Sequence, residues 1–304
     1  MILVLGATGF LGKTVCRILD QEGREYITTS LSNGVDLREH GPTIELFESA
    51  RPSIVLNCAS FVGGIQYGYK YPVDLLQNNI RMTANILEAC QLTDVKRLIN
   101  PISNCVYPAD ASLFREPEIW NGPMHESVMV YGFVRKAYLI AAYAYKKQFD
   151  QEIVNIVLSN MYGPGDHFEE ERSHAIGALI MKMVRAKALM KDEVIVWGTG
   201  KPVREWLHVN DGATALVKAI EMPYVDHPVN VGVATGISVK ELAFMIKEAV
   251  GYHGELVFDP SKPDGAEHKT VDGSLGAELL KWHPSIALKT GIEDTVAWYM
   301  ENKE

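Results

Sequence analysis

Apolar runs alternate with amphipathic segments along the first half of the chain. Short β-branched or aliphatic runs predict strands, and apolar residues that recur with a helical period predict helices. The expected strands are residues 1–5, 26–29, 53–57, 97–101 and 153–158, and the expected helices are residues 12–22, 43–50, 75–92 and 130–148. Because strands alternate with helices and crossovers are right-handed, the pattern predicts an α/β fold with a doubly wound parallel sheet of the Rossmann type.

The pattern loosens after residue 160. A Gly/Pro turn at 162–165 leads into an expected helix at 173–188, a strand at 194–197 and a final helix at 291–302. Residues 209–221 have a helical period and are suited to pack back on the sheet. We therefore expect a smaller, discontinuous C-terminal substrate domain. The expected division gives the Rossmann domain residues 1–160 and 207–232, and the substrate domain residues 161–206 and 233–304.

Composition and charge exclude several function classes. With 304 residues, of which 47% are hydrophobic and 22% charged, the chain is long enough to bury a substantial core. A net charge of −9 without a basic run argues against nucleic acid or an anionic membrane as partner. The chain enters an apolar strand without a charged leader, and no apolar stretch reaches the ~18 residues of a membrane span. We therefore expect a cytoplasmic protein with neither nucleic-acid nor membrane partners.

The four cysteines are Cys16, Cys58, Cys90 and Cys105. They lie far apart without CxxC spacing, which suits neither a zinc site nor a disulfide framework. We expect no bound metal, and we interpret three of the cysteines as small core residues. Cys105, at the end of an expected strand, is a candidate for chemistry.

A glycine-rich segment, GATGFLG at residues 6–12, follows the first strand and opens the first helix. In this context backbone N–H groups and the helix N-terminus can bind a pyrophosphate. The GxxGxxG pattern alone is weak evidence and also fits a tight structural turn, but its position favours a dinucleotide-binding loop. Ala59 and Ser60 end a later apolar run whose small side chains suit close approach to the same cofactor.

The end of the second strand bears on the choice between NAD and NADP. It reads ITTSLSN at residues 27–33, and the next acidic residue is Asp36. An acid at the strand end would bind the ribose hydroxyls of NAD, and its absence removes a group that would repel a 2′-phosphate. We therefore expect NADP. NAD stays an alternative because no arginine clamp follows the strand.

Ser103 ends an expected strand, and Tyr131 follows 28 residues later at the start of a long helix. This arrangement is typical of short-chain reductases, in which both hydroxyls bind the substrate oxygen and the tyrosine transfers a proton. A lysine four residues after the tyrosine normally supplies a positive charge. Here Arg135 holds that position and Lys136 comes one residue late. Because positions four apart share a helix face, Arg135 faces Tyr131 better than Lys136 does.

Arginine can supply charge and ribose hydrogen bonds, but it cannot relay a proton. Two interpretations stay open: a working variant of the tyrosine–lysine pair, which we favour, and impaired redox chemistry with another step retained. The residues expected to bind the cofactor are Gly6, Thr8, Gly9, Phe10, Leu11, Gly12, Asp36, Leu37, Ala59, Ser60, Tyr131, Arg135 and Asn160.

Longer motifs carry a resemblance to a known family. They are VGGI at 62–65, SNCVYP at 103–108, NMYGP at 160–164, SH at 173–174, VWGTGKPVREWLHV at 196–209 and KPDG at 262–265 followed by Lys269. Each is similar to a segment of the GDP-L-fucose synthase family, which belongs to the extended short-chain dehydrogenases/reductases. The similarity spans residues 1 to about 285. Members of this family epimerise and then reduce GDP-4-keto-6-deoxymannose.

The resemblance implies roles for single residues. Ser103 and Tyr131 would bind the C4 oxygen, while Cys105 as base and His174 as acid would epimerise C3 and C5. Because an enolate stabilises the charge beside a ketone, a thiolate and an imidazole on opposite sides can remove one proton and return another. The side chains implied to contact the GDP-linked keto-sugar are Asn160, His174, Trp197, Arg204 and Lys269. An ion pair of Arg204 with Glu205 or another acid and a core position for Trp197 are the structural alternatives.

Three departures from the family pattern qualify this resemblance: Arg135 replaces a lysine, Asn104 replaces a serine, and Phe61 stands where a lysine is common. The arginine bears on the reduction step, the asparagine changes a hydrogen-bonding partner beside the active strand, and the phenylalanine bears on the identity of the sugar. Two other functions therefore stay open, namely an epimerase or dehydratase that retains its cofactor and a catalytically silent nucleotide-binding regulator. The resemblance also implies a homodimer through the helices at 75–92 and 130–148, whose apolar faces equally suit packing on the sheet.

Overall fold

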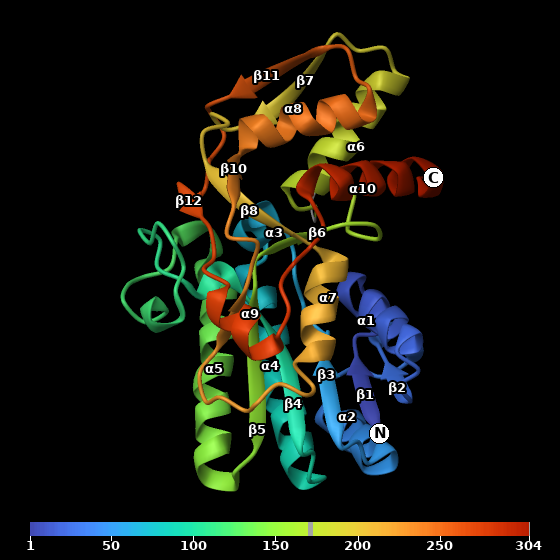
Figure 1. Ribbon diagram of the computed structural model, residues 1–304, viewed down its shortest axis with the longest axis vertical. Coiled ribbons are helices and arrows are strands. Elements are labelled where there is room, and N and C mark those ends of the chain that lie inside the picture. The colour runs from blue at the N-terminus through green and yellow to red at the C-terminus, as the bar shows by residue number, and fades with distance from the viewer. Residues whose placement is uncertain (170–172, 304) are drawn as a thin grey trace.

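A six-stranded parallel sheet forms the centre of the computed structural model, which describes residues 1–169 and 173–303. Its strand order is β2-β1-β3-β4-β5-β9 (Figure 1). The strands are β1 (Ile2–Leu5), β2 (Tyr26–Thr29), β3 (Ile54–Asn57), β4 (Arg97–Ser103), β5 (Glu152–Leu158) and β9 (Val229–Val231). The expected doubly wound α/β fold is confirmed.

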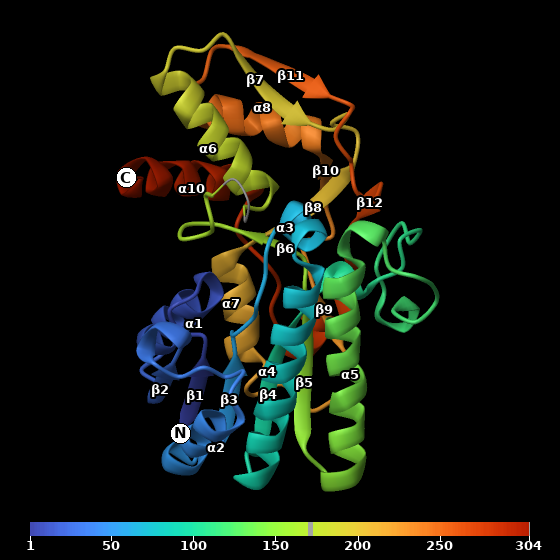
Figure 2. The same cartoon turned by 180° about the vertical axis from the view of Figure 1, so that it is seen from behind.

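Helices cover both faces of this sheet (Figures 1 and 2). Alternate residues of β1 serve opposite faces: Ile2 and Val4 pack with one pair of helices, and Leu3 and Leu5 pack with the other three. Full burial of each such side chain contributes roughly 1.5–3 kcal/mol. The first face carries α1 (Phe10–Gln21) and α7 (Val209–Lys218), and the second carries α2 (His40–Ala50), α4 (Pro72–Leu92) and α5 (Met129–Phe149).

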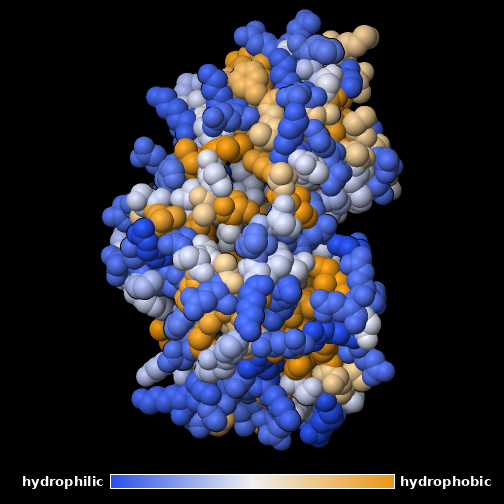
Figure 3. Space-filling model, in the orientation of Figure 1, coloured by the Kyte–Doolittle hydropathy of each residue, from blue (hydrophilic) through white to orange (hydrophobic). Residues whose placement is uncertain are grey.

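Most of the remaining elements form a second part of the molecule, which lies beyond the carboxyl ends of the sheet strands (Figure 1). Three of its helices share an apolar cluster with a two-stranded sheet, and four short strands form a further sheet around β8. Hydrophobic residues show at mid-height between the two parts (Figure 3). The elements of this part are β6 (Asn160–Tyr162), α6 (Ala175–Ala188), β7 (Glu193–Trp197), β8 (Val203–His208), β10 (Gly236–Ser238), α8 (Val239–Val250), β11 (Glu255–Asp259), β12 (His268–Lys269) and α10 (Leu288–Asn302). Helix α9 (Ser274–Leu280) instead packs against β9 of the central sheet.

The helices and strands expected in the first half are all present, with bounds that shift by three residues or fewer. Residues 209–218 do return to the sheet, because α7 packs against α1. The division into two domains at the expected bounds stays a prediction. Across the described residues, no helix has the length and apolar character that a membrane crossing requires. Short helices also lie in the connections between these elements, namely η1 (Leu31–Asn33), α3 (Ile65–Lys70), η2 (Asn104–Val106), η3 (Glu116–Glu118) and η4 (Glu126–Val128).

Candidate active site

The glycine-rich loop lies where the strand order reverses, between the carboxyl ends of β1 and β3. Gly6 has a φ of +71°, and a Cβ added to it would lie 2.7 Å from the backbone nitrogen of Ala59. A Cβ on Gly12 would overlap the carbonyl oxygen of Gly6. The loop after β3 therefore approaches the glycine-rich loop because Gly6 lacks a side chain, and the start of α1 packs on that loop because Gly12 does. Ligands of doubly wound sheets bind at such a switch point.

The first turn of α1 fits a dinucleotide pyrophosphate. Its N-cap, Gly9, provides no side-chain cap, and the turn contains no acidic residue. The N–H groups of this turn are therefore left for an anion, which the helix dipole also favours. Thr8, Phe10 and Leu11 occupy the same turn and loop, as expected from the sequence.

A chain of hydroxyl groups marks the end of β2. The Oγ atoms of Ser30 and Ser32 lie 3.0 Å apart, and Thr8 Oγ1 lies 2.9 Å from Ser32 Oγ. This chain joins the glycine-rich loop to the position where an NAD-specific site would carry a carboxylate. The hydroxyls offer hydrogen-bond donors to a ribose substituent without adding negative charge.

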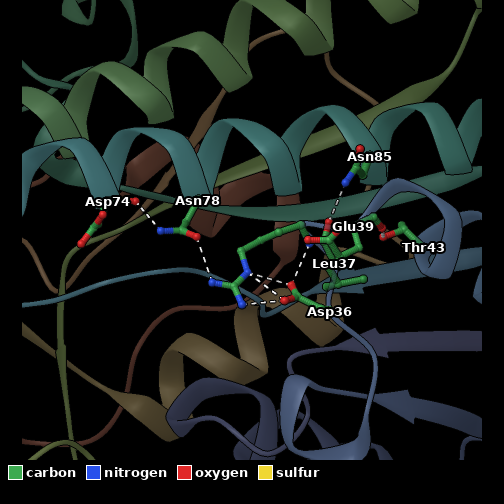
Figure 4. Close-up of polar contacts among 8 residues, drawn as sticks. Asp36, Leu37, Glu39, Thr43, Asp74, Asn78 and Asn85 are labelled. Atoms are coloured by element: carbon green, nitrogen blue, oxygen red, sulfur yellow. Dashed lines mark hydrogen bonds and ion pairs between the residues drawn. The ribbon is translucent and has the colours of Figure 1, made fainter.

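Asp36 lies farther along this segment, and its carboxylate is held by Arg38. The guanidinium donates to Asp36 Oδ2 at 2.5 Å and to Asn78 Oδ1 on α4 at 2.9 Å (Figure 4). The hydrogen bond from Arg38 holds the pKa of Asp36 below its usual value. The next residue, Leu37, is buried, and its carbonyl accepts a hydrogen bond from Asn85 at 3.0 Å. The segment is thus fixed against α4 by polar contacts.

Tyr131 and Arg135 lie on one face of α5, as the four-residue spacing predicts. Arg135 donates through Nη2 to the Tyr131 hydroxyl at 3.1 Å, to Asn79 Oδ1 at 3.3 Å, and to Ser60 Oγ. Its guanidinium carbon lies 4.8 Å from the centre of the Tyr131 ring. Arg135 is 5% exposed and has no carboxylate partner among the described residues. A buried positive charge is therefore directed at the tyrosine hydroxyl.

Lys136 takes a different direction from Arg135. Its ammonium lies 5.2 Å from the centre of the Trp120 ring, in the long loop before α5. Burial lowers the pKa of Lys136 below its usual value. Because positions five apart are rotated on a helix, Lys136 does not replace the absent lysine beside Tyr131.

Ser103 and Cys105 lie where β4 ends and η2 begins. Ser103 Oγ accepts a hydrogen bond from the Cys105 backbone N–H at 3.3 Å, which caps η2. A Cβ on Gly132 would lie 2.5 Å from the Cys105 carbonyl oxygen. The first turn of α5 therefore packs on the backbone of Cys105, and Tyr131 is carried on that turn.

A second group of polar side chains surrounds the Cys105 thiol. Lys269, which is 9% exposed, places Nζ 3.9 Å from Cys105 Sγ. His125 lines the same cavity as these two residues. Its Nδ1 accepts the Ser127 N–H at 3.2 Å, so the proton of the neutral ring resides on Nε2. Burial lowers the pKa of His125, and the charges of Lys269 and Arg204 lower it further.

Arg204 extends the positive charge of this region. It donates to the backbone carbonyls of Val203 at 2.8 Å and Asp264 at 3.2 Å, and it makes no ion pair with Glu205. The Glu205 carboxylate instead accepts backbone N–H groups, including that of Val271 at 2.8 Å. Burial lowers the pKa of Arg204 to about 10, against the opposing effects of Asp264 and Cys105.

The other expected sugar-binding residues occupy separate elements. Trp197, on β7, is 42% exposed and is therefore not a core aromatic. Lys182 and Lys262 lie over its ring at 4.7 and 5.8 Å from the centre. Asn160, on β6, donates to the carbonyl of Glu205 at 2.9 Å. These residues lie on the strands and loops of the second part.

His174 precedes α6 as its N-cap residue. Its Nδ1 lies 3.8 Å from Oδ1 of Asp166, whose side chain is 2% exposed. Desolvation lowers the pKa of His174, but the hydrogen bond and charge of Asp166 outweigh it, and the net shift is upward. No hydrogen bond joins His174 to Cys105 in the part of the chain that the structure describes.

Of the expected residues, the structure joins Tyr131, Arg135 and Ser60 in one group and Cys105 and Lys269 in another. His174, Trp197 and Asn160 instead contact other partners. Sequence reasoning did not consider His125, and it gave Asn79 no role. Asn79 carried a signal, because it is an amide on the helix face that also carries the apolar residues Leu75 and Ile86. His125 carried none, because the loop that holds it has no periodicity. Within the described residues, no cluster of His, Cys, Asp or Glu is suited to hold a metal ion.

Comparisons with known proteins place the chain among nucleotide-sugar enzymes. Residues 2–232 match the NAD dependent epimerase/dehydratase family. A putative GDP-L-fucose synthase 2 from Arabidopsis thaliana is 35% identical over 99% of this chain and 92% of its own. A GDP-L-fucose synthetase from Naegleria fowleri, solved with bound NADP, has a TM-score of 0.89 at 28% identity and covers 99% and 94%. A GDP-6-OMe-4-keto-L-xylo-heptose reductase from C. jejuni has a TM-score of 0.93 at 25% identity and covers 99% and 98%.

Proposed function

The chain belongs to the NAD dependent epimerase/dehydratase family and, within it, to the GDP-L-fucose synthases, and from this premise we propose that it is an NADPH-dependent 3,5-epimerase/4-reductase of a GDP-4-keto-6-deoxy-sugar. One observation carries the proposal. The Tyr131 hydroxyl and the Cys105 thiol lie on two segments in direct backbone contact through Gly132. One group can protonate the C4 oxygen during reduction, and the other can remove a proton from the carbon beside the ketone, after which a separate acid must return a proton to that carbon.

The switch point of the sheet would hold the nicotinamide cofactor. The glycine-rich loop and the uncapped first turn of α1 would bind its pyrophosphate, and Ala59, whose backbone meets Gly6, and Ser60 would complete the site. The hydroxyls of Thr8, Ser30 and Ser32 support NADP over NAD, since no carboxylate stands at the end of β2. When bound, the cofactor supplies the hydride that reduces C4.

The diphosphate of the sugar nucleotide binds between the two parts of the molecule. Arg204 and Lys269 are register partners on the paired strands β8 and β12, so their charges lie side by side. Two adjacent cations match the charge of a diphosphate. Asn160 and Trp197 line the approach from β6 and β7.

Epimerisation uses the Cys105 group. The Cys105 thiolate removes a proton from the carbon beside the C4 ketone, and the bond electrons move to the ketone oxygen. His174 returns a proton on the opposite side, and the nearby Asp166 favours the protonated form from which it donates. The C4 oxygen is held throughout by the hydroxyls of Ser103 and Tyr131.

Reduction uses the Tyr131 group. Tyr131 donates its proton to the C4 oxygen as that carbon is reduced, which leaves a phenolate. The Arg135 guanidinium, 3.1 Å from the hydroxyl, stabilises this negative charge. Ser60 lies 3.3 Å from the same hydroxyl and offers a route for a replacement proton.

The other two functions considered from the sequence have less support. Arg135 places a positive charge beside the Tyr131 hydroxyl, so the site retains the charge that reduction needs. Among the similar structures, the GDP-6-OMe-4-keto-L-xylo-heptose reductase has a name that describes net reduction. These observations favour a bifunctional enzyme over a retained-cofactor epimerase and over a silent regulator.

We further propose that the protein is a homodimer. Apolar side chains are exposed on both helices that the sequence suggested for an interface. On α4, Val73 and Ile80 are 58% and 37% exposed, and on α5, Ile140 and Tyr143 are 56% and 62% exposed. The two helices pack beside each other, so their outer faces can form a four-helix interface with a second copy.

Replacing Cys105 with Ser tests the assignment of the base. With GDP-4-keto-6-deoxymannose in D₂O, we expect the wild type to incorporate deuterium at C3 and C5 and Cys105→Ser to lose this exchange by two orders of magnitude or more. Binding of GDP, measured by calorimetry, should be unchanged because the phosphate cations remain. Exchange by Cys105→Ser at the rate of the wild type would refute the assignment.

A further inference from the structure

Lys269 has an unusual environment for a lysine. Its side chain is 9% exposed, and no carboxylate pairs with it among the described residues. Its one hydrogen-bond partner in this part of the chain is Cys105 Sγ, at 3.9 Å. Burying an ammonium without a counter-ion costs free energy of folding, and a negative charge placed beside it offsets part of that cost.

The fold brings these two side chains together from distant parts of the chain. Cys105 follows β4 of the central sheet in η2, whereas Lys269 ends β12 of the second part, 164 residues later. Parallel pairing of β12 with β8 sets Lys269 beside Arg204. Among the described residues, Lys269 contacts the thiol, His125 lines the same cavity, and Arg204 adds a positive charge that Cys105 senses at longer range.

We propose that Lys269 is a positioning residue that holds Cys105 as a thiolate before substrate arrives, in addition to its contact with the diphosphate. This inference rests on the proposed function, in which Cys105 is the base. Ionisation breaks the S–H bond, leaves the electron pair on sulfur, and passes the proton to water. The ammonium of Lys269 stays protonated and stabilises the new anion by its charge.

The thiolate then carries out the first proton transfer of epimerisation. The C–H bond beside the ketone breaks, an S–H bond forms, and the electron pair of the C–H bond moves to the C4 oxygen. The charge therefore leaves the sulfur as it develops on the sugar. A thiol that had to ionise after substrate binding would do so next to the diphosphate, whose negative charge opposes ionisation.

Alkylation by iodoacetamide tests this inference without substrate. Only the thiolate reacts, so the rate of Cys105 modification in the whole protein, followed by peptide mass spectrometry over a range of pH, reports ionisation. Cys58 and Cys90 serve as internal controls, because burial raises the pKa of both thiols. In the wild type, Cys105 should be alkylated faster at neutral pH than either control cysteine.

Substitution of Lys269 gives the decisive comparison. At neutral pH we expect Lys269→Met to slow alkylation about tenfold or more, and Lys269→Arg to restore most of the rate. Lys136→Met removes a cation that faces Trp120 instead, and it should alkylate like the wild type. Equal rates for Lys269→Met and wild type, or for Lys269→Met and Lys269→Arg, would overturn the inference. Should Lys269→Met fail to fold by circular dichroism, Lys269→Gln replaces it.

Two further results separate this inference from the proposed function. Lys269→Met with weakened GDP binding and unchanged alkylation would leave Lys269 as a phosphate ligand alone, and the inference would fail while the function stands. Deuterium exchange by Cys105→Ser at the wild-type rate would instead remove the function. The comparison of alkylation in the wild type and in Lys269→Met would still report whether Lys269 ionises the thiol.

Discussion

Arg135 contacts the Tyr131 hydroxyl from the position that a lysine usually holds, but its guanidinium cannot relay a proton. One nitrogen of its guanidinium donates to the Tyr131 hydroxyl, to Asn79 and to Ser60. Asn79 in turn accepts the Phe61 N–H at 3.2 Å, so the loop after β3 is tied to the same group. The helical period in the sequence was enough to predict that Arg135 faces Tyr131. It was not enough to predict that Ser60 and Asn79 also contact Arg135, because these two residues lie on other segments of the chain.

Arg135→Lys is the sharpest test of this group. A lysine ammonium is shorter and cannot keep the planar, bridged arrangement, so we expect loss of at least one charge-assisted hydrogen bond. Such a loss is worth about 1.5–3 kcal/mol, which corresponds to a fall in NADPH-dependent reduction of roughly 10- to 100-fold. Deuterium exchange at C3 and C5 should be little changed. Faster reduction by Arg135→Lys would show that the arginine is a compromised substitute.

Asp166 sets the protonation of His174. Because Asp166 raises the pKa of His174, the imidazolium that donates the second proton persists to higher pH. Asp166→Asn removes the charge, so the alkaline limb of the pH profile for deuterium exchange should move to lower pH. The reduction step, which uses Tyr131, should keep its profile. An alkaline limb that stays in place would show that His174 is not the acid or that Asp166 does not control it.

The contact between Cys105 and Lys269, on which the ionisation of the thiol depends, was harder to predict than either residue. Cys105, His174 and Lys269 were each identified from motifs, but the contact of Lys269 with the thiol depends on how β12 pairs with β8. Motifs give residue types and local order. They do not give the distance between segments that are 164 residues apart, which only tertiary packing fixes.

At the scale of elements, His208 shows how a helix start is built. It is the N-cap of α7, and its Nδ1 accepts the Asn210 N–H at 3.2 Å. The ring is 2% exposed, and burial lowers the pKa of His208 below its usual value. The neutral ring is therefore the form that caps the helix, because protonation removes the acceptor.

This cap makes stability depend on pH. The unfolded chain binds a proton to His208 near pH ~6.5, whereas the folded chain binds it only at lower pH. The stabilisation is therefore complete above pH ~6.5 and is lost as pH falls through the lowered pKa. In His208→Asn the amide oxygen can still cap but does not titrate. We expect a smaller loss of unfolding free energy between pH 8 and pH 5.5 by urea denaturation, and an unchanged loss would contradict the role of His208.

The elements of the first half were predictable because each repeats one simple signal. A buried parallel strand is a continuous apolar run, and a covering helix has one apolar face, as β5 and α1 show. The second part has three-residue strands such as β6 and β10, which are too short for a periodic signal. Helix α8 was missed although its capping box, Ser238 with Glu241, is visible in the sequence.

At the scale of the whole molecule, the exposed apolar stripes of α4 and α5 are the feature that a monomer leaves unexplained. Two of these side chains, Ile140 and Tyr143, are more than half exposed on one helix. Exposed apolar side chains that gather on adjacent helices mark interfaces more often than isolated ones do. The sequence predicted these helices but could not separate a dimer face from a sheet-facing one.

Ile140→Glu tests the dimer. A carboxylate from each copy would be buried in the interface, so we expect sedimentation to show a dimer for the wild type and a monomer for the variant. Leu189→Glu is the matched control, because Leu189 is 65% exposed after α6, on the second part of the molecule. The control should remain dimeric. A monomeric wild type, or a dimeric Ile140→Glu, would contradict the proposed interface.

The central claim is that one site performs both carbon epimerisation and net reduction. The most direct measurement follows GDP-4-keto-6-deoxymannose in D₂O with NADPH, with absorbance recording cofactor use and mass spectrometry recording deuterium in the product. The account predicts one NADPH oxidised for each sugar converted, with solvent deuterium at both C3 and C5. Deuterium in the sugar without loss of NADPH would contradict the claim, because the protein would then be an epimerase that does not reduce its substrate.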